Sequence, residues 1–108
     1  MSKALLEAAA AGDINRVTEL LKNGADIHYR NEFGATALLV AAGCGQIAMV
    51  EHLRGLNPKV LSEKDNSGCT ALLRAASNGH IAMVEHLRGL NPNVLTERTN
   101  NGVTVHSR

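Results

Sequence analysis

Histidine and carboxylate side chains that could ligate a metal recur at a fixed spacing in this 108-residue chain. Glu51 and His52 return 34 residues later as Glu85 and His86. Histidine nitrogens on one zinc ion lie within ~2.1 Å of it. Neighbouring helices pack about 8–10 Å apart, so two copies on stacked helices are too distant to share an ion. Because the chain also lacks an HExxH motif and a third ligand, the sequence predicts no metal site.

Hydroxyl and thiol groups are the other candidates for chemistry. Ser62, Ser67 and Ser77 have no His-plus-acid partners that the spacing would bring to one point, and no GxSxG, GxxxxGK[ST] or GxGxxG motif occurs. Cys44 and Cys69 form no CxxC pair, which favours small, buried or half-exposed thiols in a reducing compartment. The sequence therefore predicts a protein without catalytic residues and without a cofactor.

The composition excludes some classes of binding partner and indicates the cellular compartment. The net charge of +1 provides no broad basic surface for nucleic acid or acidic lipid. No apolar run approaches the ~20 residues that span a bilayer. The charge at Glu7 interrupts the first apolar residues too early for a signal peptide. We expect one soluble domain with no nucleic-acid or membrane partner, in the cytoplasm or, as the alternative, the nucleus.

A long internal repeat organises the elements that carry these residues. Residues 36–61 and 70–95 are identical at 21 of 26 aligned positions. A fixed period of this length is typical of stacked helical units rather than one globular core. With no Trp, one Phe and one Tyr, burial must come from aliphatic side chains and Ala, which suits thin layers of closely packed helices.

Each unit is expected to hold two short helices. Asp13, Thr36 and Thr70 are placed to cap helix N-termini, and Gly45 and Gly79 to turn the chain between the two helices of a unit. The second helices should present Ile47, Val50 and Leu53, with Ile81, Val84 and Leu87, to the interior. Gly55-Leu56-Asn57-Pro58 and its copy predict that these helices end near Arg54 and Arg88, with Leu56 and Leu90 buried.

Turn signals separate the units. Residues 31–34 (Asn-Glu-Phe-Gly), 65–68 (Asp-Asn-Ser-Gly) and 99–102 (Thr-Asn-Asn-Gly) combine Asn or Asp with a Gly that supplies positive φ. We expect each connection to project as a short hairpin-like finger.

Together these features resemble ankyrin repeats over residues 3–108. The segment Gly68-Cys69-Thr70-Ala71-Leu72-Leu73-Arg74-Ala75-Ala76-Ser77-Asn78-Gly79-His80 is similar to the family's G-x-T-P-L-H-x-A-A-x-x-G-H, and Leu21–Asp26 to its L-x-x-G-A-D. The resemblance implies an all-α solenoid with repeats at about 3–30, 31–64 and 65–98 and an incomplete fourth at 99–108. Ala-Leu-Leu replaces the family's Pro-Leu-His at 37–39 and 71–73. Loss of that His, which ties adjacent fingers, predicts a looser finger region.

The resemblance also implies a non-catalytic module that binds another protein through a concave face of finger tips and first helices. Differences between the two long repeats fall mainly there, although neutral drift at exposed positions is an alternative explanation. Phe33 is a candidate binding hot spot, and packing on the adjacent finger is its alternative role. The candidate protein-binding residues are Tyr29, Glu32, Phe33, Ala35, Val40, Cys44, Asn66, Ser67, Cys69, Arg74, Ser77 and Asn78.

A second hypothesis concerns the C-terminal end of the stack. The third repeat is nearly the same as the second, so it has not been rewritten as a polar cap. Residues 100–108 begin a fourth unit and can cover its face only partly, through Val103 and Val105. This pattern favours a structural spacer or a self-associating fragment, with a weak homodimer formed through that end.

Overall fold

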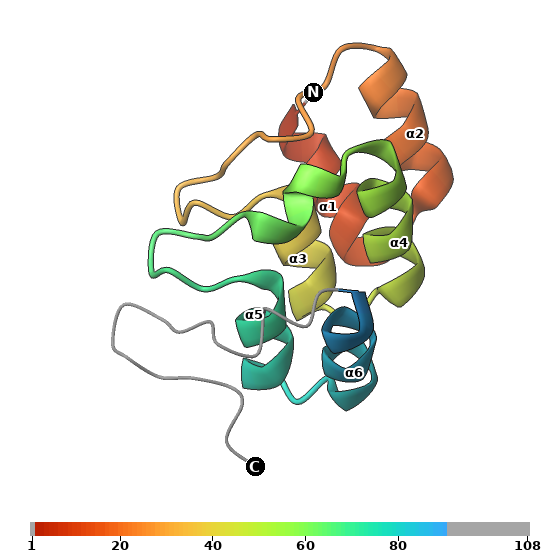
Figure 1. The fold of residues 1–108 in the computed structure, drawn as a ribbon. Helices are drawn as coiled ribbons and strands as arrows, with labels where there is room; N and C mark the ends of the chain where they lie inside the picture. Colours follow the sequence, from red (N-terminus) through yellow and green to blue (C-terminus); the bar gives the residue numbers. More distant parts are fainter. Residues whose placement is uncertain (1, 91–108) are drawn as a thin grey trace.

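The computed structural model describes residues 2–90, which form six α-helices and one short 3-10 helix, with no strand among them (Figure 1). The elements are α1 (Ser2–Ala11), α2 (Ile14–Lys22), α3 (Ala37–Gly43), α4 (Ile47–Leu56), η1 (Pro58–Ser62), α5 (Ala71–Ser77) and α6 (Ile81–Leu90). This arrangement confirms the expected all-α repeat. None of the described helices is both long and apolar enough to cross a membrane.

The helix caps and the turns within each unit lie where the sequence predicts them. The side chains of Asp13, Thr36 and Thr70 each accept a hydrogen bond from the backbone N–H three residues further on, at the first turns of α2, α3 and α5. Gly45 and Gly79 adopt φ values of 74° and 76°, so the chain can reverse between the two helices of each pair. The predicted caps and turns are therefore confirmed.

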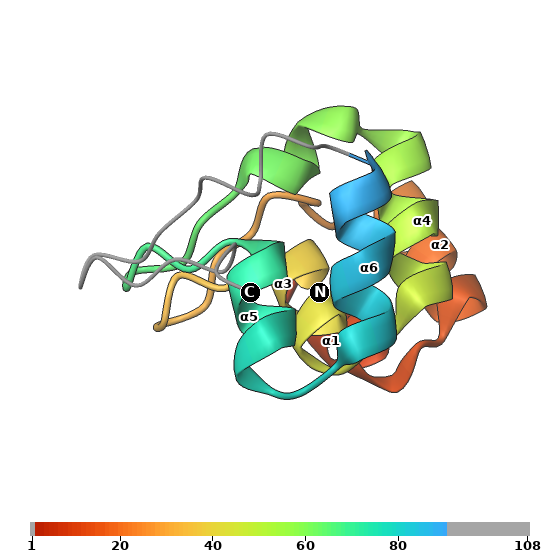
Figure 2. The ribbon, with the colours of Figure 1, turned by 60° about the horizontal axis from the view of Figure 1, so that its bottom comes forward.

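The helices form two layers. α1, α3 and α5 lie side by side as an inner layer, and α2, α4 and α6 form an outer layer beside it (Figures 1 and 2). The long loops between helix pairs project from the side of the inner layer. Side chains from both layers merge into one core, whose largest fully buried members include Leu5, Leu38, Leu39, Leu53, Leu72 and Met83.

The expected early end of the outer helices is wrong. α4 continues through Gly55 to Leu56, and Leu56 is 54% exposed instead of buried. Gly55 has no positive φ, so it is a helical residue and does not reverse the chain. The chain turns at Asn57, whose side-chain oxygen accepts a hydrogen bond from the N–H of Lys59 at the start of η1. The corresponding side chain of Leu90 lies outside the described residues.

The predicted inner stripe of the outer helices is partly wrong. Met49 and Met83, which the stripe omitted, are buried, and Val50 is buried as expected. Ile81 is 74% exposed, whereas its equivalent Ile47 is half-buried. The reason is tertiary, because α5 and α6 pack beyond α4 and no described helix packs beyond α6. The expected fourth unit, including Val103 and Val105, lies outside the described residues.

The two described fingers share one turn geometry. In the first finger (residues 31–35), the Asn31 side-chain oxygen accepts hydrogen bonds from the N–H groups of Phe33 and Ala35, at 2.9 and 3.0 Å. In the second finger (residues 65–69), Asp65 does the same for Ser67 and Cys69, at 2.9 Å each. The turns predicted at 31–34 and 65–68 are confirmed, and the turn predicted at 99–102 lies outside the described residues.

Hydrogen bonds other than the family's histidine contact join the two fingers. The backbone N–H of Asn66 donates to the carbonyl of Phe33 at 3.0 Å, and its side-chain amide donates to the carbonyl of Glu32 at 3.1 Å. Arg30 also bridges them, because its guanidinium donates to the carbonyls of Gly34 and Lys64. These contacts set the spacing between the finger tips.

Candidate functional site

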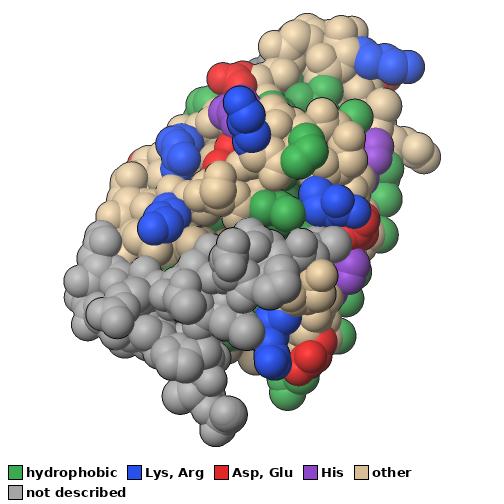
Figure 3. Space-filling model, viewed as in Figure 1, with side chains coloured by type: hydrophobic (Ala, Val, Ile, Leu, Met, Phe, Trp, Pro, Cys, Tyr) green, Lys and Arg blue, Asp and Glu red, His purple; other side chains and the backbone are tan. Residues whose placement is uncertain are grey.

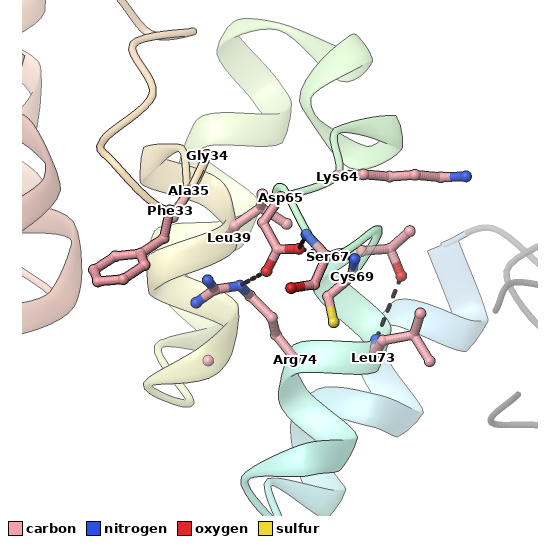
Figure 4. A network of polar contacts seen from close by, with 12 residues as sticks. Phe33, Gly34, Ala35, Leu39, Lys64, Asp65, Ser67, Cys69, Leu73 and Arg74 are labelled. Atoms are coloured by element: carbon pink, nitrogen blue, oxygen red, sulfur yellow. Dashed lines mark hydrogen bonds and ion pairs between the residues drawn. The ribbon is translucent and has the colours of Figure 1, made fainter. Parts of the chain in front are cut away.

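A pocket of about 350 Å³ opens between the inner helices and the first finger. Successive turns of α1 form one wall of the pocket, and the first finger forms the other wall. Helix α3 contributes one side chain. Its lining residues are Lys3, Leu6, Glu7, Ala10, Asn31, Glu32, Phe33 and Val40. Phe33 is 64% exposed, and its ring points toward the N-terminal helices, away from the second finger (Figure 4). The pocket therefore has an aromatic edge that is open to solvent.

The equivalent junction between α3, α5 and the second finger is filled by an ion pair. The guanidinium of Arg74 donates to the Asp65 carboxylate at 3.1 Å, and the Asp65 side chain is 9% exposed (Figure 4). Arg74 also lies over Gly43, where an added Cβ would be 3.7 Å from the guanidinium. Ser67 replaces Phe33 at the tip. The two junctions thus present different chemistry on the same scaffold.

The turns after the inner helices form a second group of exposed residues. Cys44 follows α3, Ser77 is the last residue of the corresponding helix α5, and Asn78 follows it. All three are exposed, and the Asn78 amide donates to the carbonyl of Gly43 at 2.8 Å. This bond holds the second turn against the first, so the group lies on a defined surface.

The structure separates the predicted binding residues by accessibility. Ala35 is 2% exposed, and its methyl group packs in the core just before α3. Tyr29 is half-buried against the same core. The exposed residues are Glu32, Phe33, Asn66 and Ser67 on the finger tips and Cys44, Ser77 and Asn78 at the ends of the inner helices. Val40, Cys69 and Arg74 are half-buried between these two groups.

Four pocket residues from α1 were missing from the prediction. The prediction compared the two long repeats only, and α1 lies outside them. A signal was nevertheless present, because Ala4-Leu5-Leu6 aligns with Ala37-Leu38-Leu39 at a shift of 33 residues. This alignment places Glu7, Val40 and Arg74 at one equivalent position on α1, α3 and α5. The residue at that position is acidic on α1, apolar on α3 and basic on α5.

A family profile of ankyrin repeats in three copies matches residues 5–96 of the chain. The chain belongs to the ankyrin-repeat family. Two Rickettsia felis proteins named as ankyrin repeat proteins are 43% identical over 51 residues, which is 47% of this chain and 81% and 77% of those proteins. The mitochondrial disaggregase of Bos taurus is 51% identical over 39 residues, which is 36% of this chain and 6% of that protein.

On the outer face of these ankyrin repeats, the two equivalent histidines join neighbouring helices. The Thr18 hydroxyl donates to the carbonyl of Ile14, so it must accept from His52 Nε2, at 2.9 Å. His86 contacts the Glu51 carboxylate, which Arg54 also binds. The hydrogen bond from Arg54 has the largest effect in lowering the pKa of Glu51, and the hydrogen bond from His86 lowers it further. Within residues 2–90, no three His, Cys, Asp or Glu side chains gather as a metal site.

Charged side chains of both signs are interspersed over the face shown in Figure 3. The described outer surface offers the same mixture, with Arg16 paired to Glu19 and Arg88 to Glu85. Such a surface has no extended field of one sign, so recognition must come from local groups rather than from the overall charge.

The two free thiols should differ in reactivity. Cys44 is exposed, whereas Cys69 is half-buried, and burial followed by the nearby Asp65 carboxylate raises the pKa of the Cys69 thiol. Because the thiolate is the nucleophile, we expect Cys44 to react with an aromatic disulfide reagent at mildly alkaline pH about tenfold or more faster than Cys69. Cys44→Ser should remove the fast phase of the reaction. Loss of the fast phase in Cys69→Ser instead would contradict this order.

Proposed function

We propose that the concave surface, formed by the finger tips and the pocket side of the inner helices, binds a partner protein. Ankyrin repeats are generally non-enzymatic protein–protein interaction modules. The observation that carries the proposal is Phe33, a large apolar side chain that is 64% exposed at the edge of a pocket. Aromatic residues, Phe among them, are enriched at the cores of protein–protein interfaces.

The pattern of sequence differences supports the same surface. α4 and α6 have the same ten-residue sequence, so these two outer helices repeat without change. The inner layer and fingers differ at Val40 and Arg74 and at Phe33 and Ser67. Contacts that differ from one repeat to the next allow this side to discriminate between partners.

Phe33→Ala should weaken binding of a natural partner by more than about 1 kcal/mol, because the partner loses an aromatic contact at the pocket edge. The change should leave the thermal midpoint nearly unchanged, since the ring makes few core contacts at 64% exposure. The measurement is titration calorimetry against a partner captured from cell extract with the wild-type chain.

Arg16→Ala combined with Arg88→Ala is the matched control on the outer helices. Both side chains are about half exposed and pair with exposed glutamates within their own helices. Their loss should leave partner binding unchanged. A partner that is released by this double variant and retained by Phe33→Ala would contradict binding through the concave surface.

A second candidate function is self-association through the end of the stack. The observation that favours it is the difference between Ile47 and Ile81, because the second is 74% exposed at an equivalent position. Ala42 is likewise buried, whereas Ala76 is exposed. An apolar end face of this kind can pair with a second copy of the chain. Sedimentation of the wild-type chain and of Ile81→Ser at increasing concentration tests this candidate.

Amide hydrogen exchange should be faster in α6 than in α4. Their sequences are identical, so intrinsic exchange rates match and any difference reports on packing. Val50 is buried in α4, whereas Val84 in α6 is half-buried. We expect the protection of α6 to be lower by about tenfold or more at dilute concentration. Equal protection in the two helices would contradict the weaker packing of α6, and protection that rises with concentration would favour self-association.

A further inference from the structure

We infer that the pocket between α1 and the first finger binds a partner segment in which an apolar side chain stands beside a lysine or arginine. This inference rests on the proposed protein-binding function and specifies the chemistry of the partner. Its basis is the combination of an apolar pocket floor with two carboxylates that have no side-chain partner among the described residues.

The pocket floor suits one or two aliphatic side chains. Leu6, Ala10 and Val40 supply apolar surface, and the Phe33 ring adds an aromatic edge. A volume of about 350 Å³ is at the small end of the ~300–1,000 Å³ range of ligand pockets. Binding sites of this kind combine an apolar interior with a few polar groups. The apolar floor therefore selects the partner's apolar side chain, and the rim selects the residues beside it.

The rim of the pocket carries more negative than positive charge. Glu7 projects from the α1 wall and Glu32 from the finger wall, and both are exposed. Among residues 2–90, neither carboxylate forms an ion pair or a side-chain hydrogen bond. Lys3 is the one cation among the described residues that line the pocket, where two carboxylates accompany one ammonium group. A basic side chain next to the apolar anchor would complement this rim.

The neighbouring junction places an ion pair at the equivalent position of the same scaffold. Arg74 occupies the position of Val40 there, Asp65 occupies that of Asn31, and the two form an ion pair over the inner helices. Asn31 and Asp65 accept the same two backbone hydrogen bonds, so the exchange is compatible with the finger. With Val40 and Asn31 at these positions, the first junction has no corresponding ion pair among the described residues.

The test uses a phage-displayed library of random peptides of about 12 residues, selected on the full 108-residue chain. Enriched peptides should share an apolar residue followed or preceded closely by Lys or Arg. Synthetic copies are then measured by fluorescence anisotropy. Replacing the basic residue with Gln should weaken binding about three- to tenfold at ~50 mM salt, and the difference should shrink at ~500 mM salt.

Val40→Arg, alone and with Asn31→Asp, introduces the side chains of the second junction. Either variant should lower the affinity for the enriched peptides more than about tenfold. Phe33→Ser, which copies the tip residue Ser67, provides an independent variant at an exposed position if Val40→Arg fails to fold. Glu7→Gln with Glu32→Gln should remove the preference for a basic residue and leave binding of the Gln analogue unchanged. Arg88→Ala is the control that should change nothing.

The outcomes separate this inference from the proposed function. If Phe33→Ser weakens peptide binding and both Val40 variants leave it unchanged, the inference about the pocket is overturned. The proposal that the concave surface binds a partner would still stand. Peptides that respond to outer-helix changes alone would overturn both. Enrichment of acidic peptides, of peptides without an apolar anchor, or of no peptide at all would also overturn the inference.

Discussion

Leu53→Ala is expected to destabilise the protein by about 2–5 kcal/mol, which is a large part of the ~5–15 kcal/mol that stabilises a typical domain. Leu53 is fully buried in α4, at the centre of the described stack, where both neighbouring helix pairs restrict how far the structure can relax into the cavity. The free energy of unfolding should be measured by urea titration, followed by circular dichroism.

Leu56→Ala is the control within the same helix. Leu56 is three residues further along α4 and is 54% exposed, so its truncation should change the free energy of unfolding by no more than about 0.5 kcal/mol. An equal loss of stability in the two variants would contradict the observed packing and would favour the buried Leu56 that the sequence predicted.

Gly34→Ala is expected to cost about 3 kcal/mol, because it combines backbone strain with a clash between fingers. Gly34 has a φ of 77°, and a Cβ at this position would lie 2.7 Å from the backbone N of Asn66. That N–H donates to the carbonyl of Phe33, so relief of the clash requires the inter-finger hydrogen bonds to break. The loss should appear in urea unfolding and as weaker protection of the Asn66 amide from exchange.

Gly79→Ala isolates the backbone contribution. Its φ of 76° is close to that of Gly34, and apart from its chain neighbours no atom of residues 2–90 lies within 4 Å of its added Cβ. The cost should then be about 1–2 kcal/mol from the left-handed conformation alone. If the two substitutions were equally destabilising, the contact between the fingers would not constrain Gly34.

The local structure was determined by short stretches of sequence. Thr36 and Thr70 cap helices, and Asn31 and Asp65 build turns, through hydrogen bonds to backbone groups two to four residues away. Such contacts depend on residue type and spacing within one segment, so a sequence pattern is sufficient to predict them. The repeat period then implies stacking, because one helix pair cannot bury its apolar face alone.

Burial and the pocket were decided by the tertiary structure. α4 and α6 have one sequence, yet Ile47 is half-buried and Ile81 is exposed, because burial depends on which helix pair packs alongside. Leu56 reached solvent because α4 continued two residues beyond the predicted end at Arg54. The pocket combines Glu7 with Phe33, 26 positions apart, and those side chains meet only because the first finger returns to α1 when the helices stack.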